Sequence, residues 1–209
     1  MFSVCLESTV THQSQNVLIV GFDDDKLDDV SVAKLADFGT AREDTRISDE
    51  THASTRQIVG TSPYVPPEYL RRGQVSERTD AFALGVLIVE LLVSEGYDID
   101  DVATGRQDVR VTCEDARVLV DDHMGDADAL RAAIECLSSK CAGSSWASSG
   151  AAKRAAAALT EVAINCVKGP ASRSTPDDVL PQLEAVGADA RALVSGLLFS
   201  LSARNLDSL

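Results

Sequence analysis

The amino-acid sequence predicts a mainly helical domain that carries one small β-hairpin. Residues 77–93 are the clearest helix, because they open with charged residues and are then apolar on every face. Residues 151–167 are rich in alanine and place apolar side chains along one face at helical spacing. Two short β-branched runs, 16–20 and 30–36, flank an acidic break and predict the hairpin.

The composition of the 209 residues narrows the class of protein. A 44% share of apolar residues is enough to fill a core, and the 4% aromatic share means that aliphatic side chains dominate it. The formal net charge of -14 disfavours nucleic acids and anionic membranes as partners, because both attract basic surfaces. An acidic surface of this kind also keeps an ordinary domain in solution.

No targeting or membrane signal is found in the sequence. The first fifteen residues lack the basic start of a secretory signal. The longest apolar run, Ala81–Val89, is too short for a membrane-spanning helix, which needs roughly twenty residues. The five cysteines are an odd number without a CxxC pair, which disfavours zinc and a disulfide framework. We therefore expect a cytoplasmic protein with free thiols and no membrane segment.

The segments around the hairpin are expected to be loops. Residues 21–29 contain five aspartates and predict an exposed connection between the two strands. Residues 40–56 show no periodicity and predict a long loop. Residues 62–67 include three prolines and are expected to be irregular, because proline removes a backbone donor.

The C-terminal half predicts a series of helices. Thr79 and Asp80 suit the first turn of the helix over 77–93, where caps and negative charge are favourable. Gly169 and Pro170 end the helix over 151–167, and Thr175 is a good start for the next helix. The remaining segments are short helices within 95–123, a helix over 126–137, a small-residue loop at 143–150, a helix over 176–186, and a final helix or frayed end at 188–209.

An ordered set of motifs gives the chain a family resemblance. LADFG occupies residues 35–39, GTSPYVPPE occupies 60–68, Asp80 begins the apolar helix, and Arg173 lies in PASRST. DFG alone is a weak match, but the whole set in this order resembles the C-terminal lobe of eukaryotic protein kinases. The pattern looks most like the receptor-like and interleukin-receptor-associated (Pelle-type) serine/threonine kinases. The resemblance covers residues 16–187.

The resemblance implies ATP-dependent phosphorylation of protein Ser or Thr, with Mg²⁺ and ATP as cofactors. Asp37 and Asn16 match the two family residues that hold magnesium, and both offer a hard oxygen ligand to a hard cation. Gly39 completes the DFG motif. Thr61 matches the threonine of the substrate loop in serine/threonine kinases, which favours Ser/Thr over Tyr as the acceptor.

The sequence departs from the family pattern at the catalytic loop. The family's catalytic aspartate stands five residues before the position of Asn16, where this chain has Thr11. The lysine that assists it is replaced by Gln13, and the preceding His and Arg are replaced by Thr9 and Val10. A threonine hydroxyl cannot serve as a base near neutral pH, so proton removal is compromised. The usual partners of Thr61 are also absent.

The structural matches to the family are more complete. Glu68 resembles the glutamate that pairs with a buried arginine late in the lobe, and Arg173 is the match for that arginine. Asp80 resembles the aspartate that accepts hydrogen bonds from the catalytic-loop backbone. Gly85 matches a glycine of the family's central helix. These residues are expected to hold the lobe together.

The loop over 40–56 contains candidate phosphorylation sites. The alternative is an ordinary polar loop, and Val10 stands where the family has the arginine that receives such a phosphate. The candidate residues are Thr45, Ser48, Thr51, Ser54 and Thr55.

The resemblance begins too late to include the ATP-binding lobe, since no G-x-G-x-x-G pattern precedes residue 16. Residues 1–15 are expected to be a leader outside the kinase pattern, and 188–209 a tail. Three hypotheses follow. The first is a truncated, catalytically impaired kinase, and the second is a pseudokinase-like module that binds a partner kinase or a protein substrate. The third is an incomplete gene model of an active kinase, in which residues 1–15 are foreign.

Overall fold

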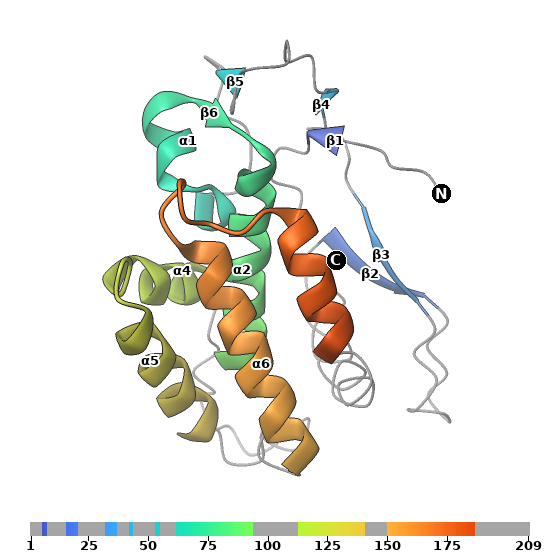
Figure 1. Cartoon of the computed structure of the whole chain (residues 1–209), viewed down its shortest axis with the longest axis vertical. Helices are drawn as coiled ribbons and strands as arrows, with labels where there is room; N and C mark the ends of the chain where they lie inside the picture. The colour runs from blue at the N-terminus through green and yellow to red at the C-terminus, as the bar shows by residue number, and fades with distance from the viewer. Residues whose placement is uncertain are drawn as a thin grey trace, which may run out of the picture.

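The computed structural model describes the helical part of the chain and several short strands. All structural statements below concern the described residues, which are 6–7, 16–20, 32–36, 42–43, 53–54, 62–93, 113–140 and 150–186. Most of them are helical, as predicted (Figure 1).

Helix α2 (Glu77–Val93) lies at the centre of the fold. Thirteen of its residues are buried, which explains why it is apolar on every face. Helices α4 (Cys113–Asp122), α5 (Ala127–Lys140) and α6 (Gly150–Val167) pack around it (Figure 1). The predictions of a buried helix over 77–93 and an amphipathic helix over 151–167 are confirmed.

The start of α2 is closed by a local capping arrangement. The backbone N–H of Ser76 donates to the Thr79 hydroxyl oxygen at 3.1 Å, and the N–H of Thr79 donates to the Ser76 carbonyl at 2.8 Å. The hydroxyl oxygen of Thr79 therefore satisfies the backbone N–H of Ser76, three residues earlier, as the third helical residue of a capping box does.

A tight turn joins α4 to α5. Gly125 has a φ of 95°, in a region that residues with a side chain rarely adopt. Asp126 then accepts a hydrogen bond from the N–H of Ala129 at 2.9 Å and caps α5. The helix predicted over 126–137 is thus confirmed, and one of the helices expected within 95–123 is α4.

The chain leaves α6 through a short turn and enters the last helix of the described residues, over 176–186. The Thr175 hydroxyl accepts from the N–H of Asp178 at 3.3 Å, and the Asp178 carboxylate accepts from the N–H of Thr175 at 2.9 Å. This reciprocal cap confirms the predicted helix start. The N–H of Thr175 and its hydroxyl both donate to the Asp178 carboxylate, and these two hydrogen bonds lower the pKa of that carboxyl.

The predicted β-hairpin is present. Strand β2 (Val17–Val20) pairs antiparallel with β3 (Val32–Leu35), and Val17 faces Leu35 in the register. Figure 1 shows this hairpin on the opposite side of the view from α4 and α5.

The prediction that residues 62–67 are irregular was wrong. Residues 62–67 contain a 3-10 helix, η2 (Ser62–Tyr64), and begin helix α1 (Pro67–Arg72). Pro67 is favourable in the first turn of a helix, because the N–H that it lacks has no helical partner there. The sequence pattern showed the prolines, but a proline breaks a helix only beyond its first turn.

Only four residues of the predicted loop over 40–56 are described, and they form two short strands. Strand β4 (Arg42–Glu43) pairs with β1 (Leu6–Glu7), and β5 (Ala53–Ser54) pairs with β6 (Gln74–Val75). Each pairing joins segments that are distant in the sequence, so a local pattern could not indicate it.

Three predicted segments lie wholly or mostly outside the described residues: the acidic loop at 21–29, the small-residue loop at 143–150 except Gly150, and the tail at 188–209. Among the described residues, no helix is both long and apolar enough to cross a membrane.

Gly85 lies where α2 packs against α6, and this contact generates a stability prediction. A Cβ atom added there would lie 2.7 Å from both the Cys166 Cβ and the Val167 Cγ1 atoms, which is too close for any pair of carbons. We expect Gly85→Ala to lower the free energy of unfolding by about 1–3 kcal/mol, because α2 and α6 must move apart. Urea unfolding measures this loss.

Gly169→Ala is the matched control. A Cβ at Gly169 meets no atom within 4 Å, so this variant should unfold like the wild type. Equal stability of Gly85→Ala and Gly169→Ala would contradict the close packing of α2 on α6.

Candidate functional site

A buried ion pair links the start of α1 to the turn after α6. Arg173 donates to the two carboxylate oxygens of Glu68, from Nη1 at 2.5 Å and from Nη2 at 3.4 Å. The side chain of Arg173 is 1% exposed and that of Glu68 is 13% exposed. The structure therefore brings together the two residues that the family resemblance pairs.

The remaining donors of Arg173 bind backbone carbonyls. Nε donates to the Lys168 carbonyl at 3.0 Å, and Nη1 also donates to the Arg78 carbonyl at 3.1 Å. Burial lowers the pKa of the guanidinium, and the carboxylate of Glu68 acts in the opposite direction. One side chain thus joins α1, the start of α2 and the end of α6.

A second arginine holds the segment before α1. Arg117 of α4 donates from Nη1 to the carbonyls of Pro63, at 3.0 Å, and Val65, at 2.6 Å. Its Nε donates to the Asp121 carboxylate at 2.9 Å. The sequence analysis missed this role, because only the Arg117–Asp121 spacing is visible in the sequence.

The ring of Phe82 lies against both arginines. The guanidinium carbon of Arg117 is 5.0 Å from the ring centroid, and that of Arg173 is 4.8 Å from it. Such contacts are attractive when a cation faces an aromatic ring. Phe82, which is fully buried in α2, therefore connects the two arginine clusters.

A buried hydrogen bond joins the 3-10 helix to α2. The Tyr64 hydroxyl donates to Glu90 Oε2 at 2.7 Å, and both residues are at most 4% exposed. The sequence contained one sign of this contact, because Glu90 is the charged residue that ends the long apolar run of α2. The partner, Tyr64, was not indicated.

One of the two candidate magnesium ligands, Asn16, is described. Asn16 is buried immediately before β2, and its carbonyl accepts from the N–H of Ala36 at 2.8 Å. Ala36 immediately precedes Asp37 in the sequence, and Asp37 itself lies outside the described residues. Within the described part of the chain, no group of three or more His, Cys, Asp or Glu residues could hold a metal.

The other predicted site residues fall into two groups. Asp80 is buried in the first turn of α2, while the catalytic-loop residues expected beside it are not described. Of the candidate phosphorylation sites, only Ser54 is described, in β5, where it pairs with Gln74. The site residues outside the described part are Thr11, Gln13, Gly39, Thr45, Ser48, Thr51, Thr55 and Thr61.

The three described cysteines are free thiols, as expected. Burial raises the pKa of the Cys166 thiol to about 12. Partial burial, with the Glu114 carboxylate beside it, raises the pKa of Cys113 to about 11. Cys136 is exposed on α5.

Comparison with known proteins identifies relatives of this sequence. The family model described as "Protein kinase domain" matches residues 7–178. The putative cysteine-rich receptor-like protein kinase 32 of Arabidopsis thaliana is 47% identical over 72 residues, which are 32% of this chain and 11% of that protein. The proline-rich receptor-like protein kinase PERK15 of the same plant is 47% identical over 66 residues, which are 32% of this chain and 12% of that protein.

A further relative matches over a longer stretch. The serine/threonine-protein kinase PBL13 of Arabidopsis thaliana is 36% identical over 96 residues, which are 46% of this chain and 18% of that protein. In each case the match spans less than a fifth of the relative's length.

The buried ion pair generates a stability prediction. Glu68→Gln removes the carboxylate and leaves a buried guanidinium without a counter-charge. We expect a loss of about 3–5 kcal/mol in the free energy of unfolding. Urea unfolding followed by circular dichroism measures it.

An exposed ion pair of the same length provides the control. Arg131 donates to Glu161 at 2.5 Å, but these side chains are 32% and 50% exposed. Glu161→Gln should cost no more than about 1 kcal/mol, because water stabilises the remaining charge. Equal losses in the two variants would contradict a special role for burial.

The cysteines should differ in reactivity. With the pKa values of Cys113 and Cys166 raised to about 11 and about 12, few of these thiols are thiolates at about pH 8. Among the three described cysteines, we expect iodoacetamide to modify Cys136 before Cys113 and Cys166 in the native protein, and the modification of Cys113 to accelerate as the pH rises. Peptide mapping by mass spectrometry resolves each site. Rapid native modification of Cys166 would contradict its burial.

Proposed function

This chain belongs to the protein kinase family, and we propose that it carries the helical lobe of a serine/threonine-type kinase domain whose phosphoryl transfer is impaired. The observation that carries the impairment is Thr11, which stands at the position of the catalytic aspartate. The observation that supports the lobe is the Glu68–Arg173 pair, formed between the motif residues that the family pairs.

The residues around the hairpin fit a magnesium site in part. Asn16 and Asp37 offer an amide oxygen and a carboxylate, which are the hard ligands that Mg²⁺ takes. The hydrogen bond between the Ala36 N–H and the Asn16 carbonyl brings the residue that precedes Asp37 in the sequence to Asn16. When bound, ATP would supply the phosphoryl group and Mg²⁺ would neutralise its charge. Asn16 and Asp37 would hold the metal.

The proposed impairment concerns the removal of the proton from the substrate hydroxyl that accepts the phosphoryl group. Phosphoryl transfer requires a positioned hydroxyl and a residue that takes its proton. Thr11 has no group that accepts a proton near neutral pH, and Gln13 replaces the assisting lysine. Thr61 keeps the serine/threonine-type residue of the substrate loop without these partners. We propose that the chain binds protein partners more readily than it modifies them.

The binding role is supported by the family, because protein kinases act on proteins. We propose that the chain binds a partner kinase or a protein substrate in the cytoplasm. The hydroxyls of 45–55 remain candidate phosphorylation sites under this proposal.

Mg-ATP provides the test of the proposed impairment. We expect the chain to transfer no labelled phosphate from Mg-ATP to a mixture of generic protein substrates, because Thr11 cannot take the proton of the acceptor hydroxyl. A ligand at a hundred times its Kd would stabilise the fold by about 2.7 kcal/mol, so the unfolding temperature shows separately whether Mg-ATP binds. The control is Asp37→Asn, which should likewise transfer no phosphate.

A rise in unfolding temperature in the wild type that is absent from Asp37→Asn would establish nucleotide binding. Transfer of labelled phosphate by the wild type alone would contradict the impairment. Mass spectrometry of native peptides across residues 7–20 tests the alternative that residues 1–15 are foreign. A catalytic-loop aspartate at residue 11 in those peptides would replace our proposal with that of an active kinase.

A further inference from the structure

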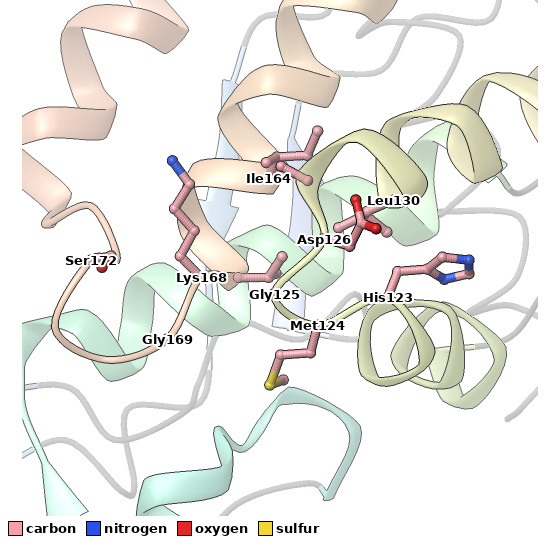
Figure 2. A pocket seen from close by; sticks show the side chains of 11 residues that line it. His123, Met124, Gly125, Asp126, Leu130, Ile164, Lys168, Gly169 and Ser172 are labelled. Atoms are coloured by element: carbon pink, nitrogen blue, oxygen red, sulfur yellow. The ribbon is translucent and has the colours of Figure 1, made fainter.

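Two adjoining hollows form one groove on the surface of the helical lobe. The first, of about 410 Å³, lies between the α4–α5 turn and the end of α6, and Figure 2 shows His123 and Lys168 on opposite sides of it. The second, of about 240 Å³, lies between α1 and the turn at 169–173. Both are lined by Met124 and Gly169, so they are continuous. We call them together the α1–α6 groove.

The α1–α6 groove is basic on a strongly acidic protein. Its lining includes four Lys and Arg residues but only two Asp and Glu residues, although the chain has a formal charge of -14. Arg71 and Arg72 are exposed in the last turn of α1, and Lys168 is exposed at the end of α6. Three cations from two elements therefore converge on one groove.

The two acidic residues of the lining do not cancel its positive charge. Glu68 is paired with Arg173, and Asp126 keeps its charge, because the backbone N–H of Ala129 that it accepts is neutral. With Arg71, Arg72 and Lys168 set against Asp126, the lining carries a formal excess of two positive charges. Lys168 donates to the side-chain oxygen of Asn165 at 2.7 Å. Because Asn165 is neutral, this hydrogen bond does not compensate the positive charge of Lys168.

The floor of the groove is apolar. Met124 is 39% exposed where the two hollows meet, and Leu130, Ile164 and Val167 line the first hollow. A flexible methionine adapts to apolar side chains of different shapes. The groove therefore combines cations at the rim with apolar surface below them.

A third hollow on the same lobe differs from the α1–α6 groove in charge. The hollow between α6 and the helix over 176–186 is lined by one arginine and one glutamate, Arg154 and Glu161, among mainly apolar residues. It has no excess of positive charge. Basic character is thus a local property of the α1–α6 groove and not of the whole surface.

We propose that the α1–α6 groove docks an acidic peptide segment of a partner protein, with Arg71, Arg72 and Lys168 facing its carboxylates and Met124 contacting an apolar side chain. Complementary charge selects the partner, because an acidic chain repels acidic segments elsewhere on its surface. The inference deepens the proposed binding role and rests on it. It requires neither ATP nor magnesium.

Fluorescence anisotropy of a labelled short peptide made of Glu, Asp and Leu tests the proposal on the full chain. We expect saturable binding that weakens as salt is raised through about 0.1 M, where the screening length is about 10 Å. The double variant Arg71→Glu/Arg72→Glu should bind about tenfold more weakly or worse. Lys168→Glu, on a different element, should weaken binding in the same direction.

The matched control is Lys153→Glu/Arg154→Glu. These residues are exposed near the other end of α6, about 20 Å along the helix from Lys168, and the change in charge is identical. This variant should bind the peptide within about twofold of the wild type. Circular dichroism melts establish that each variant is folded.

Met124→Ala tests the apolar floor, and it should weaken binding without changing the salt dependence. The proposal is overturned if the wild type does not bind the peptide, or if both double variants weaken binding equally. Phosphate transfer by the chain would overturn the proposed impairment and leave the binding result unaffected, so the two failures are distinguishable.

Discussion

The buried guanidinium of Arg173 is the constraint on which the rest of the fold depends. A charge that is 1% exposed must be satisfied by protein groups, and the structure supplies Glu68 and two backbone carbonyls. These partners belong to α1, to the start of α2 and to the end of α6. Their relative positions are therefore linked through one side chain, and two of these elements, α1 and the end of α6, line the α1–α6 groove.

The constraint extends to the 3-10 helix through Phe82. Its ring contacts both Arg173 and Arg117, and Arg117 binds the carbonyls on either side of Tyr64. Tyr64 in turn donates to Glu90, further along α2. The segment around Tyr64 is thus attached to the core through its backbone carbonyls and through the Tyr64 side chain. Such a network holds its shape independently of phosphoryl transfer, which is consistent with a lobe that binds partners.

The sequence predicted the parts of the structure that local chemistry determines. The helices over 77–93, 151–167 and 176–186 follow from apolar spacing and from caps such as Thr175, and the β2–β3 hairpin follows from its β-branched runs. The pairing of Glu68 with Arg173 was expected from motif order alone. Arg117 and Tyr64 were missed, because their partners are decided by tertiary packing. The strands β4 and β5 were missed for the same reason, and α1 because its proline was taken as a helix breaker.

Hydrogen exchange followed by mass spectrometry tests most directly whether the Arg173 cluster organises the lobe. In the wild type, the slowest amides should lie in α2 and in the half of α6 that packs on it. In Glu68→Gln, protection should fall first in α1 and in the turn at 168–173, while the centre of α2 exchanges last. Unchanged protection of α1 in that variant would contradict the account, because α1 would then be held by contacts other than the ion pair.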